Sequence, residues 1–189
     1  MRGPANATSM TAPRIVAAAL LLAGCGGAGI YGHSPQYRPL GSERDIVAGA
    51  REYDPVGLAR RPDDWRRGNV VLFGVVDRRA VGPGGQALLR LAARSLEPRN
   101  VCERSADDDS CRVTVSDQDF GVLWALVALR ADDDIGPLAV GQRSLVRVVG
   151  GIAQDVSPVD GAPVVHAIWY RHWPAGQYTT RRAARMRSP

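Results

Sequence analysis

The sequence predicts a mainly β domain that follows one short helix. Three observations support this fold class: apolar runs rich in valine, stretches in which apolar and polar residues alternate, and turns containing glycine or proline between them. Valine-rich apolar runs are typical of buried strands, and alternation with a period of two is typical of strands with one buried face. A chain of 189 residues with 45% hydrophobic residues can bury the core of one domain.

Five segments carry the strand pattern: residues 69–78, 86–96, 111–117 running on into 120–129, 144–152 and 164–173. The apolar run 120–129 is also compatible with a helix, but its valines and tryptophan favour a buried strand. In the last segment, Val165 and Trp169 are expected to share one face. His166 and His172 are expected to lie together on the other face.

Residues 86–96 fit two patterns. Leu88, Leu91 and Leu96 would lie on one face of a helix. Leu89 and Leu91 instead alternate with polar or small residues, as in a strand. Periodicity alone leaves both assignments open.

The segment AVGQRSLVRVVGGI, residues 139–152, resembles a recurring piece of OB-folds, in which a glycine turn leads into a strand of alternating valines that ends at a glycine. OB-folds are five-stranded Greek-key barrels. The resemblance implies that the five segments close into such a barrel, and it favours a strand for residues 86–96. An open β-sandwich is the alternative. The clear helix expected between the third and fourth strands is missing from the pattern.

The beginning of the sequence predicts an export signal. Arg2 and Arg14 precede the apolar run Ile15–Ala23. A transmembrane helix needs about 20 apolar residues, so this run is too short to span a bilayer. A basic start, a short apolar run and small residues at its end form the pattern of a secretory signal peptide. Met10 is an alternative start, because a signal beginning there is more compact.

The residues LAGC, Leu22 to Cys25, resemble the lipobox of bacterial lipoproteins. In that family the cysteine receives a diacylglycerol and the chain is cut just before it. The resemblance implies that Cys25 is the lipidated first mature residue and that the protein is bound to a membrane through its lipid anchor. Gly26 resembles the sorting pattern of the outer membrane, with the inner membrane as the alternative. The chain as a whole resembles small OB-fold envelope lipoproteins facing the periplasm.

The predicted organisation has four parts. Residues 1–24 form the signal peptide, and residues 25–67 form a flexible tether with a short helix, in which Ser42 is the expected cap and Trp65 packs on the domain. Residues 68–178 form the barrel, and residues 179–189 form a disordered basic tail.

The charge distribution argues against a basic binding face. All 24 basic residues are arginines, and the formal net charge is +5. Two arginines lie in the signal and four in the last nine residues, so that removing these six charges from +5 leaves −1. Because a nucleic-acid footprint requires basic residues on a folded face, we expect no nucleic-acid partner.

The two remaining cysteines, Cys102 and Cys111, predict a disulfide, because an even pair at short spacing in an exported protein is typical of one. A metal site would need further cysteine or histidine ligands nearby, and a redox pair would have closer spacing. The acidic runs 107–109 and 132–134 lack the alternating ligand pattern of calcium loops. We therefore expect no metal and no cofactor.

The sequence contains no motif of a catalytic site. It has neither a G-x-S-x-G elbow nor an H-E-x-x-H pattern. His166 and His172 are six residues apart on one strand, which corresponds to roughly 20 Å, so they cannot share a metal. Both are expected to be surface residues, and we expect the protein not to be an enzyme.

One aromatic cluster is the best candidate for a binding surface. It comprises Trp169, Tyr170, Arg171, Trp173 and Tyr178. Aromatic residues and arginine are enriched at the centres of protein interfaces, and aromatics also form platforms for sugars. The alternative is that Trp169 fills the core while the others cover the barrel edge. The sequence predicts a non-catalytic docking module that binds another envelope protein, with a module binding peptidoglycan or lipopolysaccharide glycans as the alternative.

Overall fold

The computed structural model describes residues 31, 34–103 and 110–186. Within these ranges the elements are, in chain order, α1 (Gly41–Ala48), β1 (Ala50–Glu52), α2 (Pro55–Arg60), α3 (Pro62–Arg66), β2 (Asn69–Val81), the 3₁₀ turn η1 (Pro83–Gly85), β3 (Ala87–Arg94), β4 (Val113–Val115), β5 (Val122–Val127), α4 (Ala131–Asp134), β6 (Leu145–Val156), β7 (Pro163–Trp173), β8 (Tyr178–Thr180) and α5 (Arg181–Arg185).

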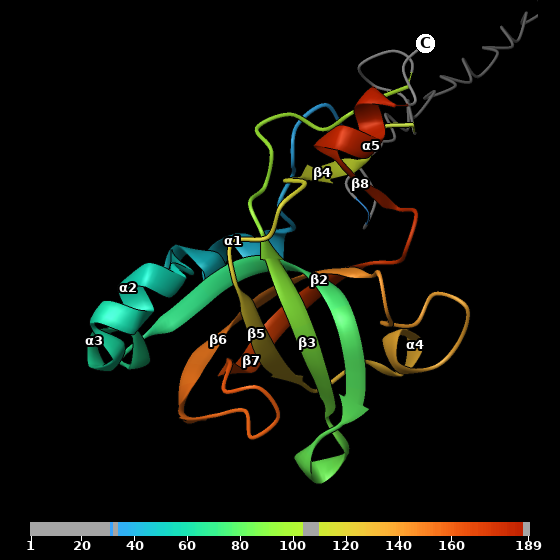
Figure 1. The fold of residues 1–189 in the computed structure, drawn as a ribbon. Coiled ribbons are helices and arrows are strands. Elements are labelled where there is room, and N and C mark those ends of the chain that lie inside the picture. The colour runs from blue at the N-terminus through green and yellow to red at the C-terminus, as the bar shows by residue number, and fades with distance from the viewer. Residues whose placement is uncertain (1–30, 32–33, 104–109, 187–189) are drawn as a thin grey trace, which may run out of the picture.

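Five strands close into a barrel (Figure 1). They pair in the order β2, β3, β5, β7, β6, and β6 pairs back with β2. The β5–β7 pairing is parallel and the other four are antiparallel. This connectivity is that of an OB-fold, so the predicted fold is confirmed. The short strand β1 adds to the outside of the closed barrel, parallel to β2.

The third predicted strand is divided differently from the prediction. Only Val122–Val127 joins the barrel, as β5. The preceding β4 pairs in parallel with β8 in a separate two-stranded sheet, which Figure 1 shows beside α5. The ambiguous segment 86–96 forms a strand, β3, in which buried and half-buried residues alternate. A helix of one turn, α4, lies between the third and fourth barrel strands.

The apolar core has two parts. The larger cluster fills the barrel and includes Leu89, Leu91, Leu123 and Val148. The smaller, which we call the outer cluster, contains Phe73, Val113, Val115, Leu145 and Trp173, with the side chains of Tyr31, Tyr37, Val75, Leu96 and Tyr178 packed against it. Strand β2 contributes to both, because successive side chains of a strand point to opposite faces.

Residues 34–67, within the segment 25–67 that was predicted to be a tether with a short helix, pack against the barrel. The side chain of Tyr37 packs in the outer cluster, and Trp65 packs in the barrel cluster as predicted. Ser42 is not the cap of α1: the helix begins at Gly41, and the backbone N–H of Leu40 donates to the Glu43 carboxylate at 3.0 Å. Two further short helices, α2 and α3, form in the segment for which a flexible tether with one short helix was predicted.

Residues 179–186 also differ from the prediction, which gave a disordered tail for residues 179–189. Strand β8 continues to Thr180 and α5 follows it directly. The backbone N–H of Arg182 donates to the Asp117 carboxylate at 2.6 Å, which holds the start of α5 beside the β4–β5 connection. None of the helices in the described ranges has the length and hydrophobicity of a membrane span.

Candidate binding cleft beside the last barrel strand

A bulge in β7 changes which side chains face the barrel interior. Val149 of β6 pairs with Trp169, whereas the next residue, Gly150, pairs with Ala167, so one residue of β7 is left without an opposite partner. A Cβ atom at position 150 would lie 2.1 Å from a carbonyl oxygen of β7, so only glycine permits this approach. An extra residue in one strand reverses the alternation beyond it.

The bulge overturns the predicted faces of β7. Val165 faces the barrel core before it, and Tyr170 faces the same core after it. Trp169 therefore does not share a face with Val165 and is half-buried. His166 is exposed, whereas His172 is 6% exposed, so the prediction that both are surface residues is wrong for His172.

The structure brings together three of the five predicted binding residues. Trp169, Tyr170 and Arg171 line one cleft of about 300 Å³, which we call the β7 cleft. Trp173 is fully buried in the outer cluster, where its indole N–H donates to the carbonyl of Tyr31 at 2.8 Å. Tyr178 lies at another cavity, together with residues of the β7–β8 turn.

The β7 cleft forms because β7 is longer than its parallel partner. The pairing with β5 ends at His166, and within the described ranges no strand pairs with the same edge of β7 beyond that residue. One wall of the cleft comes from the segment before the barrel and the other from the α4 region. The wall residues are Tyr31, Leu40, Ser42, Arg130, Asp132, Asp133 and Leu138. Leu138 is 50% exposed and gives the cleft an apolar rim.

The Arg171 guanidinium is already engaged in the structure. It donates to Glu43 Oε2 at 3.1 Å and stacks over the Trp173 ring at 4.6 Å. Glu43 is completely buried and also pairs with Arg147 of β6. Burial raises the pKa of Tyr37, and its hydroxyl donates to Glu43. This arrangement fastens α1 to the barrel.

A hydrogen-bonded network forms the polar side of the cleft. The Tyr170 hydroxyl donates to Asp133 Oδ2 at 2.7 Å and accepts from the backbone N–H of Arg130 at 2.8 Å. Burial raises the pKa of Tyr170 to about 12. Burial alone would raise the pKa of Asp133, but hydrogen bonds from Tyr170, Arg130 and His172 outweigh it and hold that pKa below its usual value.

His172 extends this network to a serine. Its Nδ1 lies 3.2 Å from Asp133 Oδ1 and its Nε2 lies 3.3 Å from Ser144 Oγ. Burial lowers the pKa of His172 below 6.5, against the effect of Asp133. With the ring neutral, the network assigns the Nδ1 proton to the bond with Asp133 and makes Nε2 the acceptor from Ser144.

The order serine, histidine, aspartate is that of serine hydrolases, but the surroundings of Ser144 differ from a nucleophile's. Ser144 is 2% exposed, and its Oγ accepts from the backbone N–H of Gly141 at 3.1 Å. His172 and Asp133 line the cleft, whereas Ser144 does not. The arrangement ties the turn before β6 to β7 and α4. The sequence pattern missed it because the partners of His172 lie 28 and 39 residues away.

Part of the face that OB-folds commonly use for oligonucleotides and sugars is covered by one of the protein's own side chains. In OB-folds this face belongs to the second and third barrel strands, here β3 and β5. Asp160, from the β6–β7 loop, accepts from Arg90 Nε of β3 at 2.9 Å and from Trp124 Nε1 of β5 at 2.8 Å. Trp124 is 2% exposed and belongs to neither core cluster, so its ring is not presented as a stacking platform.

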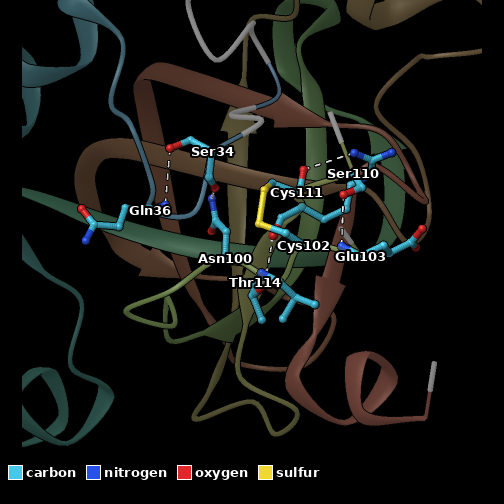
Figure 2. Close-up of a disulfide and its surroundings, with 10 residues drawn as sticks. Ser34, Gln36, Asn100, Cys102, Glu103, Ser110, Cys111 and Thr114 are labelled. Atoms are coloured by element: carbon cyan, nitrogen blue, oxygen red, sulfur yellow. Dashed lines mark hydrogen bonds between the residues drawn. A yellow bond between two sulfur atoms is a disulfide. The ribbon is translucent and has the colours of Figure 1, made fainter. Parts of the chain in front are cut away.

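The predicted disulfide between Cys102 and Cys111 is present (Figure 2). Two residues before Cys102, the chain is held next to the segment before the barrel, because the Asn100 side-chain nitrogen donates to the Ser34 carbonyl at 2.8 Å. The acidic run 107–109 and the predicted lipidation site Cys25 lie outside the described residues.

No protein-family model matches the sequence. No curated protein sequence matches it either. Among solved structures, the protein priB from Ralstonia solanacearum is similar, with 19% identity, coverage of 56% of this chain and 97% of that chain, and a TM-score of 0.28. A small single-stranded DNA-binding protein from Streptomyces coelicolor is similar with 21% identity, coverage of 56% of this chain and 91% of that chain, and a TM-score of 0.30.

The second of these structures contradicts the prediction that the chain has no nucleic-acid partner, and that prediction is withdrawn. At these identities and TM-scores the likeness concerns the fold and assigns no ligand to the present chain.

Proposed function

We propose that the protein is a periplasm-facing lipoprotein of the outer membrane, with the inner membrane as the alternative, which docks another envelope protein in the β7 cleft without catalysing a reaction. The single observation that carries the docking role is an apolar-rimmed cleft along a strand edge that has no strand partner within the described residues.

The envelope location rests on two sequence features. The LAGC residues ending at Cys25 resemble a lipobox, and acyl chains hold a protein at a membrane without a spanning helix. The Cys102–Cys111 disulfide is of the kind that persists in oxidising compartments such as the periplasm. Replacing Cys25 by Ser tests the anchor: labelled palmitate is expected in the unchanged chain and not in the variant. Equal labelling of both would contradict the assignment.

The strand edge determines the kind of partner. An unpaired edge offers backbone N–H and C=O groups that an extended segment of another protein can satisfy, while side-chain pockets supply specificity. Leu40, Leu138 and Trp169 provide apolar surface on both sides of this edge, and Arg130 and Asp132 provide charges at the rim. The proposed occupant is therefore an extended segment of an envelope protein added beside β7.

A photo-crosslinking residue placed at position 138 tests this proposal in intact cells. The expected result is an adduct with one envelope protein, cross-linked through an extended segment, and no such adduct from position 81. Val81 is the matched control because it is 87% exposed and apolar but does not line the cleft. Identical adducts from both positions, or none from position 138, would contradict docking in the cleft.

Tryptophan fluorescence then identifies the class of ligand in the purified protein. Of the four tryptophans, Trp65, Trp124 and Trp173 are buried, so a solvent-dependent change on binding reports Trp169. A synthetic peptide of the cross-linked segment is expected to change this signal, and the change is expected to vanish in Trp169→Phe. A response to peptidoglycan fragments or lipopolysaccharide instead would favour the glycan alternative. A response only to a single-stranded oligonucleotide would overturn both.

A further inference from the structure

A second cavity, distinct from the β7 cleft, lies where β1 ends and β3 takes its place along β2. It has a volume of about 250 Å³. Its wall combines two arginines, one acid and three aromatic rings. These residues are Arg94, Arg147, Glu52, Tyr53, Phe73 and Phe120.

Both arginines of the wall have an unused donor. Arg147 is 9% exposed, and its Nε–H finds no acceptor among the described residues. The Nε–H of Arg94 is also buried and also has no acceptor among the described residues. Buried donors in native proteins are almost always hydrogen-bonded, so these two arginines, which both line the cavity, keep unused hydrogen-bonding capacity beside it.

The charges of these arginines are also incompletely balanced. Arg147 shares its one carboxylate partner within the described ranges, Glu43, with Arg171. The Arg94 guanidinium lies 4.0 Å from the Asp119 carboxylate and otherwise contacts backbone carbonyls, one of them that of Ser116 at 3.4 Å. An anion entering the cavity would meet two guanidinium groups.

The other residues of the wall indicate what kind of group the anion carries beside its charge. Phe73 and Phe120 supply ring surface, and Tyr53 packs on Phe120 with ring centroids 6.3 Å apart. Phe120 is 40% exposed, so apolar surface is available without unfolding the core. Glu52 is exposed and faces the same space, and its carboxylate repels ligands of high negative charge.

We propose that this cavity binds a small monocarboxylate with an apolar or aromatic body. The carboxylate lies toward Arg94 and Arg147, where charge-assisted hydrogen bonds to guanidinium groups are strong. The body lies against Phe73 and Phe120. Glu52 disfavours dianions such as phosphate.

Calorimetric titration of the full chain in detergent with phenylacetate tests the proposal, with phenylacetamide as the uncharged isostere. Phenylacetate is expected to bind at least about tenfold more tightly than the amide, because only the acid forms charge-assisted hydrogen bonds. Inorganic phosphate is expected not to compete. Equal affinity for acid and amide, no binding of the acid, or displacement by phosphate would each overturn the proposal.

Two exposed positions provide variants that leave the buried ion pairs intact. Glu52→Gln removes the repelling charge and is expected to tighten phenylacetate binding roughly threefold. Phe120→Ala removes ring surface and is expected to weaken binding roughly fivefold. Asp155→Asn is the matched control, since Asp155 is an exposed acid outside the cavity. If phenylacetate binding responds equally to Glu52→Gln and to Asp155→Asn, the ligand binds outside this cavity and the proposed site is refuted.

Discussion

Glu43, in a helix that precedes the barrel, forms a buried ion pair with Arg147, which lies 104 residues further along the chain. The same carboxylate also accepts from Arg171 at 3.1 Å. Glu43→Gln would remove the charge that both guanidinium groups contact in a buried setting. We expect the free energy of unfolding, measured by urea denaturation, to fall by about 3–5 kcal/mol.

The control for this measurement is Glu52→Gln, an acid-to-amide change at an exposed position of the next element. It is expected to alter the free energy of unfolding by no more than about 0.5 kcal/mol. If Glu43→Gln has an equally small effect, the buried pair does not hold α1 on the barrel.

The buried His172 predicts a pH dependence of stability. Because burial lowers its folded-state pKa below 6.5, the unfolded chain binds this proton more readily than the folded chain. The contribution of His172 is therefore fully present above about pH 6.5 and is lost as pH falls toward the folded-state pKa. We expect denaturation midpoints to decrease between pH 7 and pH 5. His172→Gln should flatten this decrease, whereas His166→Gln, at an exposed position, should preserve it.

The hydrogen bond from the Trp124 indole to Asp160 predicts that this indole is shielded from solvent. Hydrogen bonds from Arg90, which has the larger effect, and from Trp124 lower the pKa of Asp160 to about 2. The contribution of the ionised Asp160 to stability is therefore present at and above the usual carboxylate pKa, and it is lost as pH falls through about 2. In a Trp169→Phe background, acrylamide quenching should stay low from pH 7 to about pH 3 and rise in Asp160→Ala. Strong quenching before that substitution would show that the face is open.

Ser144 is predicted not to act as a nucleophile, despite its contact with His172. A fluorophosphonate probe, which reacts with activated serines, should leave the protein unlabelled. Ser144→Ala should lower the free energy of unfolding by about 1 kcal/mol, because the backbone N–H of Gly141 loses its acceptor. Labelling that disappears in Ser144→Ala would instead establish a hydrolase and refute the non-catalytic assignment.

The barrel was predictable from sequence because its strands carry local patterns. In β3, for example, Leu89 and Leu91 alternate with half-buried residues, and the structure buries both completely. The division between β4 and β5 was not predictable, because it depends on pairing between β4 and the distant β8. Apolar residues suit either sheet, so their pattern does not indicate which partner is nearby.

The candidate cleft was only partly predictable for the same reason. Aromatic content pointed to residues 169–178, yet the bulge opposite Gly150 decides which of them face inward. Trp173 was expected at a surface, but it is completely buried against a segment that was expected to be a tether. No sequence pattern indicated that Glu43 is buried, because a single acid in a short helix ordinarily faces solvent.

Under the proposed lipidation of Cys25, the hydrogen bond from Trp173 to the carbonyl of Tyr31 would also limit the distance between the protein and a membrane. Tyr31 follows the proposed lipidated residue, Cys25, by only six positions, and such a stretch of chain reaches at most about 20 Å. With Cys25 lipidated as proposed, the barrel would be held close to the bilayer surface. Because Tyr31 also lines the β7 cleft, a partner would have to meet the protein near the lipid headgroups.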